Sequence, residues 1–302
     1  MQAAPLPQLH VFLAVARHRS FSGAARELGV STSAVSQAIK QLEDQLHVVL
    51  LTRTTRAVAP TEAGRRLVET AGPAMKQVAD AFASVAAKPG EVIGRVKISV
   101  GRSAVPLVIT PVLPVFRARY PRIELEIVVE ERFVDLIGEG YDAGVRLTEA
   151  IERDMVQVRL TGELRFVVVG APAYFAARGR PKKPEDLRDH DCITFRSLTT
   201  GVLYAWELER GKRTWRIPVR GGVVTNESQL CVTLAERGLG LAYAVESAVA
   251  DRIRAGTLEL VLESYAPTVP GFFLYYPNRA QSSPALRLFV EVAKEVLLRD
   301  RA

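Results

Sequence analysis

The sequence predicts a chain of two parts, in which a long helix joins an N-terminal all-α winged helix-turn-helix module to a larger α/β body. Three patterns predict this: helix-turn-helix spacing within residues 20–56, an apolar heptad seam over 61–87, and alternating strand and helix patterns from residue 95 onward. A length of 302 residues suggests about two domains.

The helix-turn-helix pattern begins with a helix at residues 22–28. Gly29 ends this helix, because a residue without Cβ adopts the left-handed conformation easily. Ser31 then stands at the N-cap of a second helix. Intervals of four, three and four residues place four apolar side chains on one face of that helix: Val35, Ile39, Leu42 and Leu46.

The opposite face of the second helix is polar. It carries short or hydrogen-bonding side chains and no carboxylate: Thr32, Ser33, Ser36, Gln37 and Lys40. Such side chains can exchange hydrogen bonds with base edges in a major groove, which favours a DNA-reading helix. The alternative interpretation is an ordinary solvated helix face. A hairpin follows, and we expect Arg53, Thr54, Thr55 and Arg56 at its tip to contact DNA as a wing.

The positive charge is concentrated at this end of the chain. Residues 1–66 contain eight Lys or Arg against four Asp or Glu, while the whole chain has a net charge of +7. This asymmetry favours a DNA-binding N-terminal module. No stretch approaches the ~18–20 apolar residues that span a bilayer, and the N-terminus lacks a secretion signal, so we expect a cytoplasmic protein without a membrane partner.

Two further helices complete the N-terminal part. Residues 7–17 form a first helix that packs across the helix-turn-helix. Residues 61–87 form a long helix that Thr61 opens, with Pro73 as a site of bending or of an altered turn. Six apolar residues with an average spacing of 3.5 residues form a seam along this helix: Leu67, Ala71, Ala74, Val78, Ala81 and Val85. Such a seam predicts that the helices of two copies pair, and the alternative is that the helix packs on its own chain.

Beyond a linker rich in Pro and Gly, strands and helices alternate, which predicts a mostly parallel sheet covered by helices. The pattern crosses from one lobe to another and returns. We expect lobe I at 92–161 and 267–302 and lobe II at 162–266. The expected division of the whole chain is 1–60 for the DNA-binding domain, 61–88 for the linker helix and 92–302 for the two-lobed α/β body. Expected helices include 105–120, 133–138 and 284–298.

The residue patterns favour binding over catalysis. The sequence contains no G-x-S-x-G, phosphate-loop or G-x-G-x-x-G motif in a suitable setting, and no histidine at metal-ligand spacing. We therefore expect neither an enzyme nor a cofactor or metal, with an enzyme bearing a DNA-binding tail as the alternative. Cys192 and Cys231 lie in apolar runs, which predicts two buried thiols, the alternative being a redox pair.

Ligands of open α/β sheets bind beyond the carboxyl ends of strands. This rule selects twelve candidate residues: Gly101, Arg102, Ser103, Glu130, Glu131, Arg146, Phe195, Arg196, Ser197, Thr225, Asn226 and Ser228. The three arginines among them suit a small organic anion, since a guanidinium binds carboxylate bidentately. In the alternative, Glu130 and Glu131 neutralise the arginines and leave a nearly apolar or polyol-sized pocket.

The run from Leu9 to Gly64, with SFSGAARELGVSTSAVSQAIKQLE followed by LTRTTRAVAPTEAG, resembles the winged helix-turn-helix of LysR-type transcriptional regulators. Two positions depart from that family: His47 stands where glycine is usual, and Thr32 where proline or glutamine is common. The first departure predicts a strained or altered turn, and the second an unusual base contact.

The resemblance implies a transcriptional regulator that binds operator DNA and is switched by a small-molecule effector. The effector would bind in a two-lobed domain of the type 2 periplasmic-binding-protein architecture. The resemblance further implies a homodimer or homotetramer, formed through the linker helix and effector domain, and contact with RNA polymerase. A repressor without effector control is the alternative.

Overall fold

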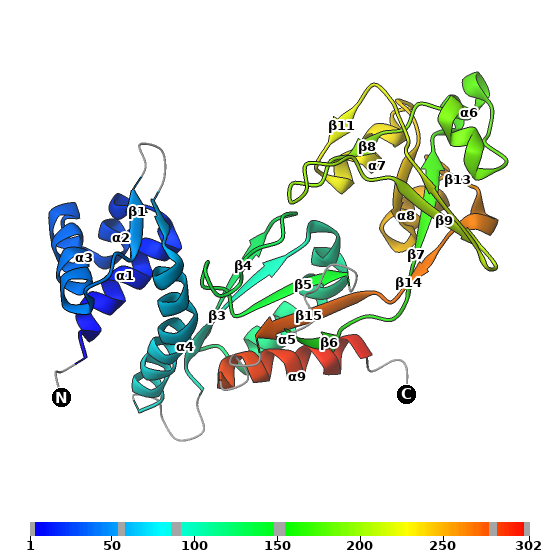
Figure 1. Cartoon of the computed structure of the whole chain (residues 1–302). Helices are drawn as coiled ribbons and strands as arrows, with labels where there is room; N and C mark the ends of the chain where they lie inside the picture. The colour runs from blue at the N-terminus through cyan, green and yellow to red at the C-terminus, as the bar shows by residue number, and fades with distance from the viewer. Residues whose placement is uncertain (1–3, 54–57, 86–91, 148–154, 278–282, 299–302) are drawn as a thin grey trace.

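The computed structural model describes residues 4–53, 58–85, 92–147, 155–277 and 283–298. Figure 1 shows a helical module at one end, a first α/β lobe in the middle and a second α/β lobe at the far end. Helix α4 (Glu62–Val85) connects the module to the first lobe. The predicted fold class is therefore confirmed. No helix in the described ranges is both long and apolar enough to cross a membrane.

The N-terminal module follows the predicted order of helix, turn, helix and hairpin. Its elements are α1 (Leu6–His18), α2 (Phe21–Leu28), α3 (Thr32–Leu46) and the antiparallel pair β1 (Leu51–Arg53) and β2 (Val58–Pro60). Gly29 ends α2 with a φ of 66°. The Ser31 Oγ caps α3 by accepting the Ala34 N–H at 3.1 Å, so both local signals act as predicted.

The core of the module is formed by the apolar stripe of α3 together with α1 and α4. Phe12, Val35, Ile39 and Leu42 are all at most 1% exposed. Leu46 was predicted to extend the stripe, but it is 43% exposed. Leu46 is the last residue of the helix, and the chain turns away at His47, so the apolar stripe leaves the core at the final turn.

Helix α4 begins after Thr61, whose Oγ1 accepts the Gly64 N–H at 3.1 Å. It remains helical through Pro73. Leu67 packs on the module's core, whereas Val78 is 47% exposed and Phe82 75% exposed. Helix α4 thus contributes to the core near its N-terminus and presents apolar side chains to solvent further along.

Lobe I contains a five-stranded sheet in the order β4-β3-β5-β15-β6. The strands are β3 (Gly94–Val100), β4 (Ile123–Val129), β5 (Ala143–Leu147), β6 (Met155–Arg159) and β15 (Phe272–Pro277). Strands β4, β3 and β5 are parallel as predicted, and β15 runs antiparallel to β5 and β6. Helices α5 (Thr110–Arg119) and α9 (Pro284–Leu298) pack together beside the sheet, with the Phe116 and Phe289 rings 5.4 Å apart.

Two expected helices of lobe I differ in the structure. One regular helix was expected at 105–120. In the structure, the 3₁₀ turn η1 (Arg102–Ala104) comes first, the π-helical turn η2 (Val105–Ile109) forms the start of the expected range, and α5 follows. Pro106 and Pro111 remove backbone donors there, which disfavours a regular start. The helix expected at 133–138 is absent, and turns occupy 136–140. The Asp135 Oδ1 accepts the Gly138 N–H at 2.9 Å, a local bond that competes with a helix.

Lobe II is built around β7 (Leu164–Gly170). Strands β12 (Ala242–Val245), β13 (Glu259–Val261) and β14 (Thr268–Val269) pair with it, all antiparallel, so the expectation of a mostly parallel sheet was wrong for this lobe. The remaining elements are α6 (Pro172–Arg178), η4 (Pro184–Asp189), β8 (Thr194–Phe195), β9 (Trp206–Arg210), β10 (Arg213–Ile217), β11 (Val224–Thr225), α7 (Ser228–Glu236), α8 (Glu246–Arg254) and η5 (Glu263–Tyr265).

The chain passes between the lobes twice, once between β6 and β7 and once between β14 and β15. The lobes are therefore joined by two stretches of chain, an arrangement that permits hinge motion.

Strands β6, β13 and β14 and helix α6 had not been predicted.

Candidate DNA interface and effector site

The polar face of α3 lies on the surface of the N-terminal module. Thr32, Ser33, Gln37 and Lys40 are exposed, and Ser36 is half-buried. Because Val35 and Ile39 hold the other face in the core, these five side chains share one side of a fixed helix. In Figure 1, α3 lies on the side of the module that points away from the two lobes. The described parts of the two lobes therefore do not cover the face that a DNA groove would approach.

The hairpin after α3 is fixed to this helix by Glu43. The Glu43 Oε1 accepts the backbone N–H groups of Leu50 at 2.7 Å and Leu51 at 3.1 Å. Gly64 allows α4 to approach the same strand, since a Cβ at this position would lie 2.2 Å from the Leu50 carbonyl oxygen. The predicted tip residues Thr54, Thr55 and Arg56, and the side chain of Arg53, lie outside what the structure describes.

His47 adopts the left-handed conformation expected of a glycine, with a φ of 53°. Its backbone N–H still reaches the Glu43 carbonyl and closes the helix. A residue with a Cβ held in this region costs ~1–2 kcal/mol, so the turn is strained rather than rebuilt. Glu43 restrains the chain on both sides of His47 through its carbonyl and its carboxylate.

The two lobes meet at an interlobe junction beside the carboxyl ends of β3 and β4. The Arg102 Nε of lobe I lies 3.3 Å from the Glu227 Oε1 of lobe II. The Thr199 hydroxyl of lobe II accepts the Phe133 N–H of lobe I at 2.8 Å. Of the four residues in these two contacts, only Arg102 was among the predicted strand-end candidates.

Both helical N-termini at the junction are bound to carboxylates of the protein itself. The Glu131 Oε1 accepts the Arg102 N–H at 3.2 Å, where η1 begins. Glu227 caps α7 by accepting the N–H groups of Gln229 at 2.9 Å and Leu230 at 2.7 Å. The dipoles of these termini favour an anion, and the side chains of Glu131 and Glu227 already supply one at each terminus.

Burial raises the pKa of Glu131, and Glu227 contributes in the same direction. The Arg102 N–H and the charges of Arg146 and Arg102 oppose the shift without cancelling it. The folded protein therefore holds this carboxyl in an environment that disfavours its ionised form.

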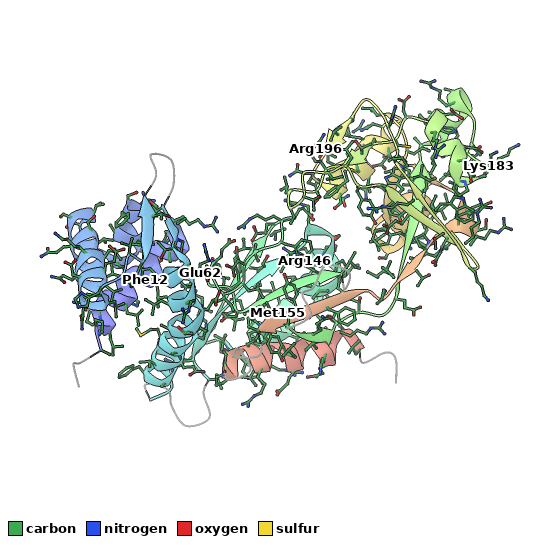
Figure 2. All side chains as sticks on the ribbon, viewed as in Figure 1. Phe12, Glu62, Arg146, Met155, Lys183 and Arg196 are labelled. Atoms are coloured by element: carbon green, nitrogen blue, oxygen red, sulfur yellow. The ribbon has the colours of Figure 1, made fainter. Side chains whose placement is uncertain are left out.

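Arg146 is buried in lobe I and does not have the free guanidinium that the sequence led us to expect. Only 6% of the residue is exposed. Its Nη2 donates to the Glu130 carbonyl at 3.1 Å, the Arg132 carbonyl at 2.9 Å and the Ser99 hydroxyl at 2.9 Å. Arg146 thus fixes the chain that follows β4. Figure 2 shows Arg146 in lobe I and Arg196 in lobe II.

The lobe II candidates mostly support their own loops. Phe195 and Thr225 are paired across the parallel strands β8 and β11. Arg196 donates its backbone N–H to the Thr225 carbonyl at 2.7 Å and its Nη1 to the Gly201 carbonyl at 2.8 Å, and the Ser197 hydroxyl accepts the Thr200 N–H at 3.2 Å. Asn226 is exposed, Ser228 begins α7, and in lobe I Gly101 is buried and Ser103 half-buried.

Five residues of the junction were not predicted from the sequence: Ser99, Arg132, Phe133, Thr199 and Glu227. Glu227 directly precedes α7, and a carboxylate at the N-terminus of a helix interacts favourably with the helix dipole, a signal that the strand-end rule did not use. The other four had no local sequence signal, because their hydrogen-bond partners lie 14, 47 or 66 residues away along the chain.

The two cysteines are buried in different core clusters of lobe II. Both are free thiols, and burial raises the pKa of Cys192 to about 12 and that of Cys231 to about 11. These thiols are poor nucleophiles, which agrees with a packing role. Within the described residues, no cluster of His, Cys, Asp and Glu could hold a metal ion.

Two protein-family profiles match the chain. A profile described as "Bacterial regulatory helix-turn-helix protein, lysR family" matches residues 6–65. A second, described as "LysR substrate binding domain", matches residues 89–298. The first covers the module with α3, and the second covers both lobes with their junction.

Relatives and solved structures agree with these matches. A putative transcriptional regulator of Pseudomonas aeruginosa is 41% identical over 289 residues, covering 96% of this chain and 94% of that protein. The HTH-type transcriptional regulator PgrR of Escherichia coli is 34% identical, with 97% and 98% covered. The structure of CrgA, a LysR-type transcriptional regulator from Neisseria meningitidis, has a TM-score of 0.59 and 27% identity, covering 98% of this chain and 99% of that one. ArgP from Mycobacterium tuberculosis, at 21% identity, shares the fold with a TM-score of 0.68 and 96% of each chain covered.

Proposed function

Because this chain belongs to the LysR family and is a transcriptional regulator with a substrate-binding domain, we propose that α3 reads operator DNA under the control of a small molecule bound at the interlobe junction. The observation that carries the DNA half is the exposed polar face of α3, which has no carboxylate over residues 32–41, on a helix fixed by its buried side. An enzyme with a DNA-binding tail has no support from the family or from the relatives.

The reading residues we propose are Thr32, Ser33, Ser36, Gln37 and Lys40. Gln37→Ala should weaken binding to the specific operator and leave binding to random DNA nearly unchanged, because removing one base contact costs ~1–3 kcal/mol of discrimination. The operator fragment would come from footprinting the promoter beside the gene. Gln45→Ala, an exposed glutamine in the last turns of the same helix, is the matched control. Equal losses of affinity on both DNAs would remove Gln37 from the readers.

The wing residues Arg53, Thr54, Thr55 and Arg56 are proposed as the phosphate-binding part of the interface. Arg53→Ala and Arg56→Ala should each lower affinity on every sequence. The slope of log K against log salt should shrink by about one for each phosphate that the wing no longer neutralises. An unchanged salt dependence would contradict this assignment.

For the effector, we favour an uncharged ligand over the small organic anion that the arginines first suggested. Arg102 is paired with Glu227, Arg146 is committed to carbonyl groups, and both helical N-termini are occupied by Glu131 and Glu227. An anion would have to displace these carboxylates. Exposed apolar side chains nearby, Phe133 at 39% and Leu198 at 54%, suit the body of a neutral ligand instead.

A thermal-shift screen would compare alcohols and amides with the matched carboxylates. A ligand that binds the native state raises the melting temperature in proportion to its occupancy. We expect neutral compounds to stabilise the full chain more than their acids do. Selective stabilisation by carboxylates, abolished in Arg102→Ala, would restore the anion as the effector class. If no compound class stabilises the chain, a repressor without effector control becomes the better account.

The remaining parts of the proposal concern assembly and place. Val78 and Phe82 on α4 are exposed apolar side chains, which supports pairing of two copies through this helix, and a homotetramer would use the effector domain as its second contact. We propose the division 1–60, 61–88 and 92–302, with lobe I at 92–161 and 267–302 and lobe II at 162–266. As a regulator of promoters, the protein would work in the cytoplasm and contact RNA polymerase.

A further inference from the structure

The connection between β4 and β5, residues 130–142, runs from the interlobe junction to the N-terminal module. We propose that this β4–β5 connection is a mechanical link that transmits the state of the junction to the helix-turn-helix module. Its regulatory meaning rests on the function proposed above. The coupling between its two ends is a property of the chain alone and can be measured without effector or DNA.

At its first end, the β4–β5 connection is held by both lobes. The Phe133 N–H donates to the Thr199 hydroxyl of lobe II at 2.8 Å. Next to it, Glu131 accepts the Arg102 N–H, while the Arg102 side chain pairs with Glu227 of lobe II. A change in lobe separation must therefore either move residues 131–133 or break these bonds.

The middle of the connection is cross-braced by charged groups. Arg132 bridges two carboxylates, with its Nε 2.7 Å from the Glu130 Oε2 and its Nη1 2.7 Å from the Glu139 Oε1. The Tyr141 hydroxyl donates to Glu130 at 2.7 Å, and Arg146 binds the carbonyl groups of Glu130 and Arg132 from beneath. Hydrogen bonds to charged groups are the stronger ones, so the two ends of the connection are joined by stiff contacts rather than by a slack loop.

At its second end, the connection touches the N-terminal module. Ile137 packs against the module's hydrophobic core. A Cβ at Gly140 would lie 3.1 Å from the Arg17 Cδ of α1, so backbone and side chain are already close. The Asp142 carboxylate, whose side chain is 9% exposed, pairs with Lys76 of α4 at 3.0 Å and accepts the Lys97 N–H at 2.8 Å.

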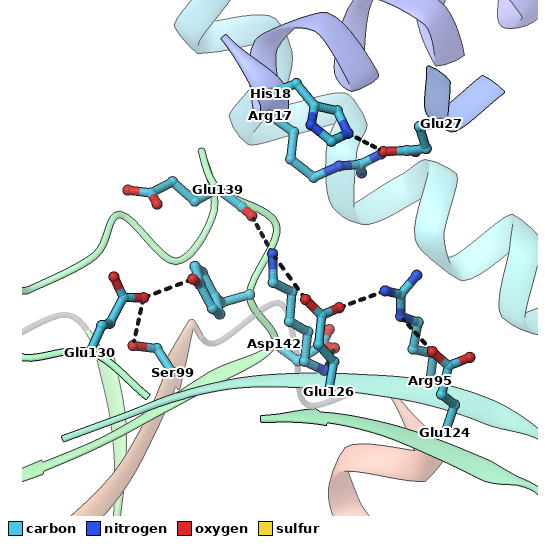
Figure 3. A network of polar contacts seen from close by, with 12 residues as sticks. Arg17, His18, Glu27, Arg95, Ser99, Glu124, Glu126, Glu130, Glu139 and Asp142 are labelled. Carbon is cyan, nitrogen blue, oxygen red and sulfur yellow. Dashed lines mark hydrogen bonds and ion pairs between the residues drawn. The ribbon is translucent and has the colours of Figure 1, made fainter. Parts of the chain in front are cut away.

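Figure 3 shows this second end, with Arg17, His18 and Glu27 of the module on one side and Glu139, Asp142 and Glu130 of lobe I on the other. A cavity of about 820 Å³ lies between them, lined by parts of α1, α4 and residues 137–142. The module and lobe I therefore touch at a few points and leave open space between them. Ile137 and the Lys76–Asp142 pair then decide the orientation in which the module is held.

These contacts make the module's orientation and the interlobe junction linked equilibria. Linkage is reciprocal: weakening the junction must loosen the module contact, and loosening the module contact must weaken the junction. This reciprocity supplies a test that needs only the full chain.

The test is hydrogen–deuterium exchange on two pairs of variants. Thr199→Ala removes the hydroxyl that binds Phe133, and Thr200→Ala removes the neighbouring hydroxyl, which accepts the Val202 N–H within lobe II. We expect exchange of the amides in 137–142 to rise about fivefold in Thr199→Ala and to stay within about twofold of wild type in Thr200→Ala. Exchange in β7 reports on intact folding in both.

The reverse experiment starts from the other end. Ile137→Ser should speed exchange at 131–133 by a similar factor. Leu239→Ser, the same kind of truncation at a lobe II residue that is 47% exposed, should not. If Thr199→Ala acts only on 131–134 and 197–201, or Ile137→Ser only on 136–142 and α1, the connection does not transmit and the proposal is overturned.

Binding of wild type to a random-sequence duplex separates this proposal from the proposed function. A wild type that binds no DNA would contradict the function, while reciprocal exchange effects would still support the link. A wild type that binds DNA with no reciprocal effects would overturn the link alone. Where both hold, Ile137→Ser should change duplex affinity at least about threefold more than Leu239→Ser does.

Discussion

Glu43 is predicted to hold the wing of the DNA-binding module in place. Its Oε1 accepts the N–H groups of Leu50 and Leu51 at 2.7 and 3.1 Å, and Leu50 is only 1% exposed. Glu43→Ala would leave at least one buried amide without an acceptor. A hydrogen bond to a charged group contributes ~1.5–3 kcal/mol, and the two bonds share one oxygen and are not additive. We therefore expect the free energy of opening the wing to fall by about 2–3 kcal/mol.

That decrease corresponds to roughly 30- to 160-fold faster exchange of the Leu50 and Leu51 amides, which NMR or mass spectrometry can measure. Glu43→Gln keeps an acceptor oxygen without the charge and should lie between wild type and Glu43→Ala. Gln45→Ala, two residues on and exposed, serves as the control. If Glu43→Ala changes the exchange of these amides by less than about threefold, the carboxylate does not restrain the wing.

Three further predictions concern other parts of the chain. Because burial raises the pKa of Glu131, ionisation of this carboxyl destabilises the folded state as pH rises. At pH 7–8, Glu131→Gln should therefore melt at a higher temperature than wild type. This difference in melting temperature should disappear below the unfolded pKa of about 4.3. A constant gap across thermal melts at several pH values would contradict this. Val78→Glu should give a monomer in sedimentation equilibrium if α4 pairs copies, and an unchanged mass would exclude Val78 from the interface. Ser31→Ala removes the cap on the Ala34 N–H and should cost ~1 kcal/mol in denaturant unfolding, with Ser22→Ala as a milder control.

The sequence by itself determined the helical module, because the signals that form it are local. Gly29 and Ser31 mark the end of one helix and the start of the next through backbone conformation and capping within three residues. Val35, Ile39 and Leu42 define a buried face by periodicity alone, and the strand at Gly94–Val100 shows the alternation of polar and apolar residues that is typical of a strand. Membership of the LysR family followed from the same stretch of chain.

Only the tertiary structure decided what the predicted strand-end residues do. Arg146 was expected to face a ligand, but the carbonyl groups that bind it belong to residues 14 and 16 positions earlier, on a segment whose path the sequence does not specify. The carboxylates at the helical N-termini and the Phe133–Thr199 bond likewise join positions far apart in sequence. Residue type limits the partners a side chain accepts, and packing alone selects one of them. The sequence therefore located the interlobe junction, while the fold assigned its charges to one another.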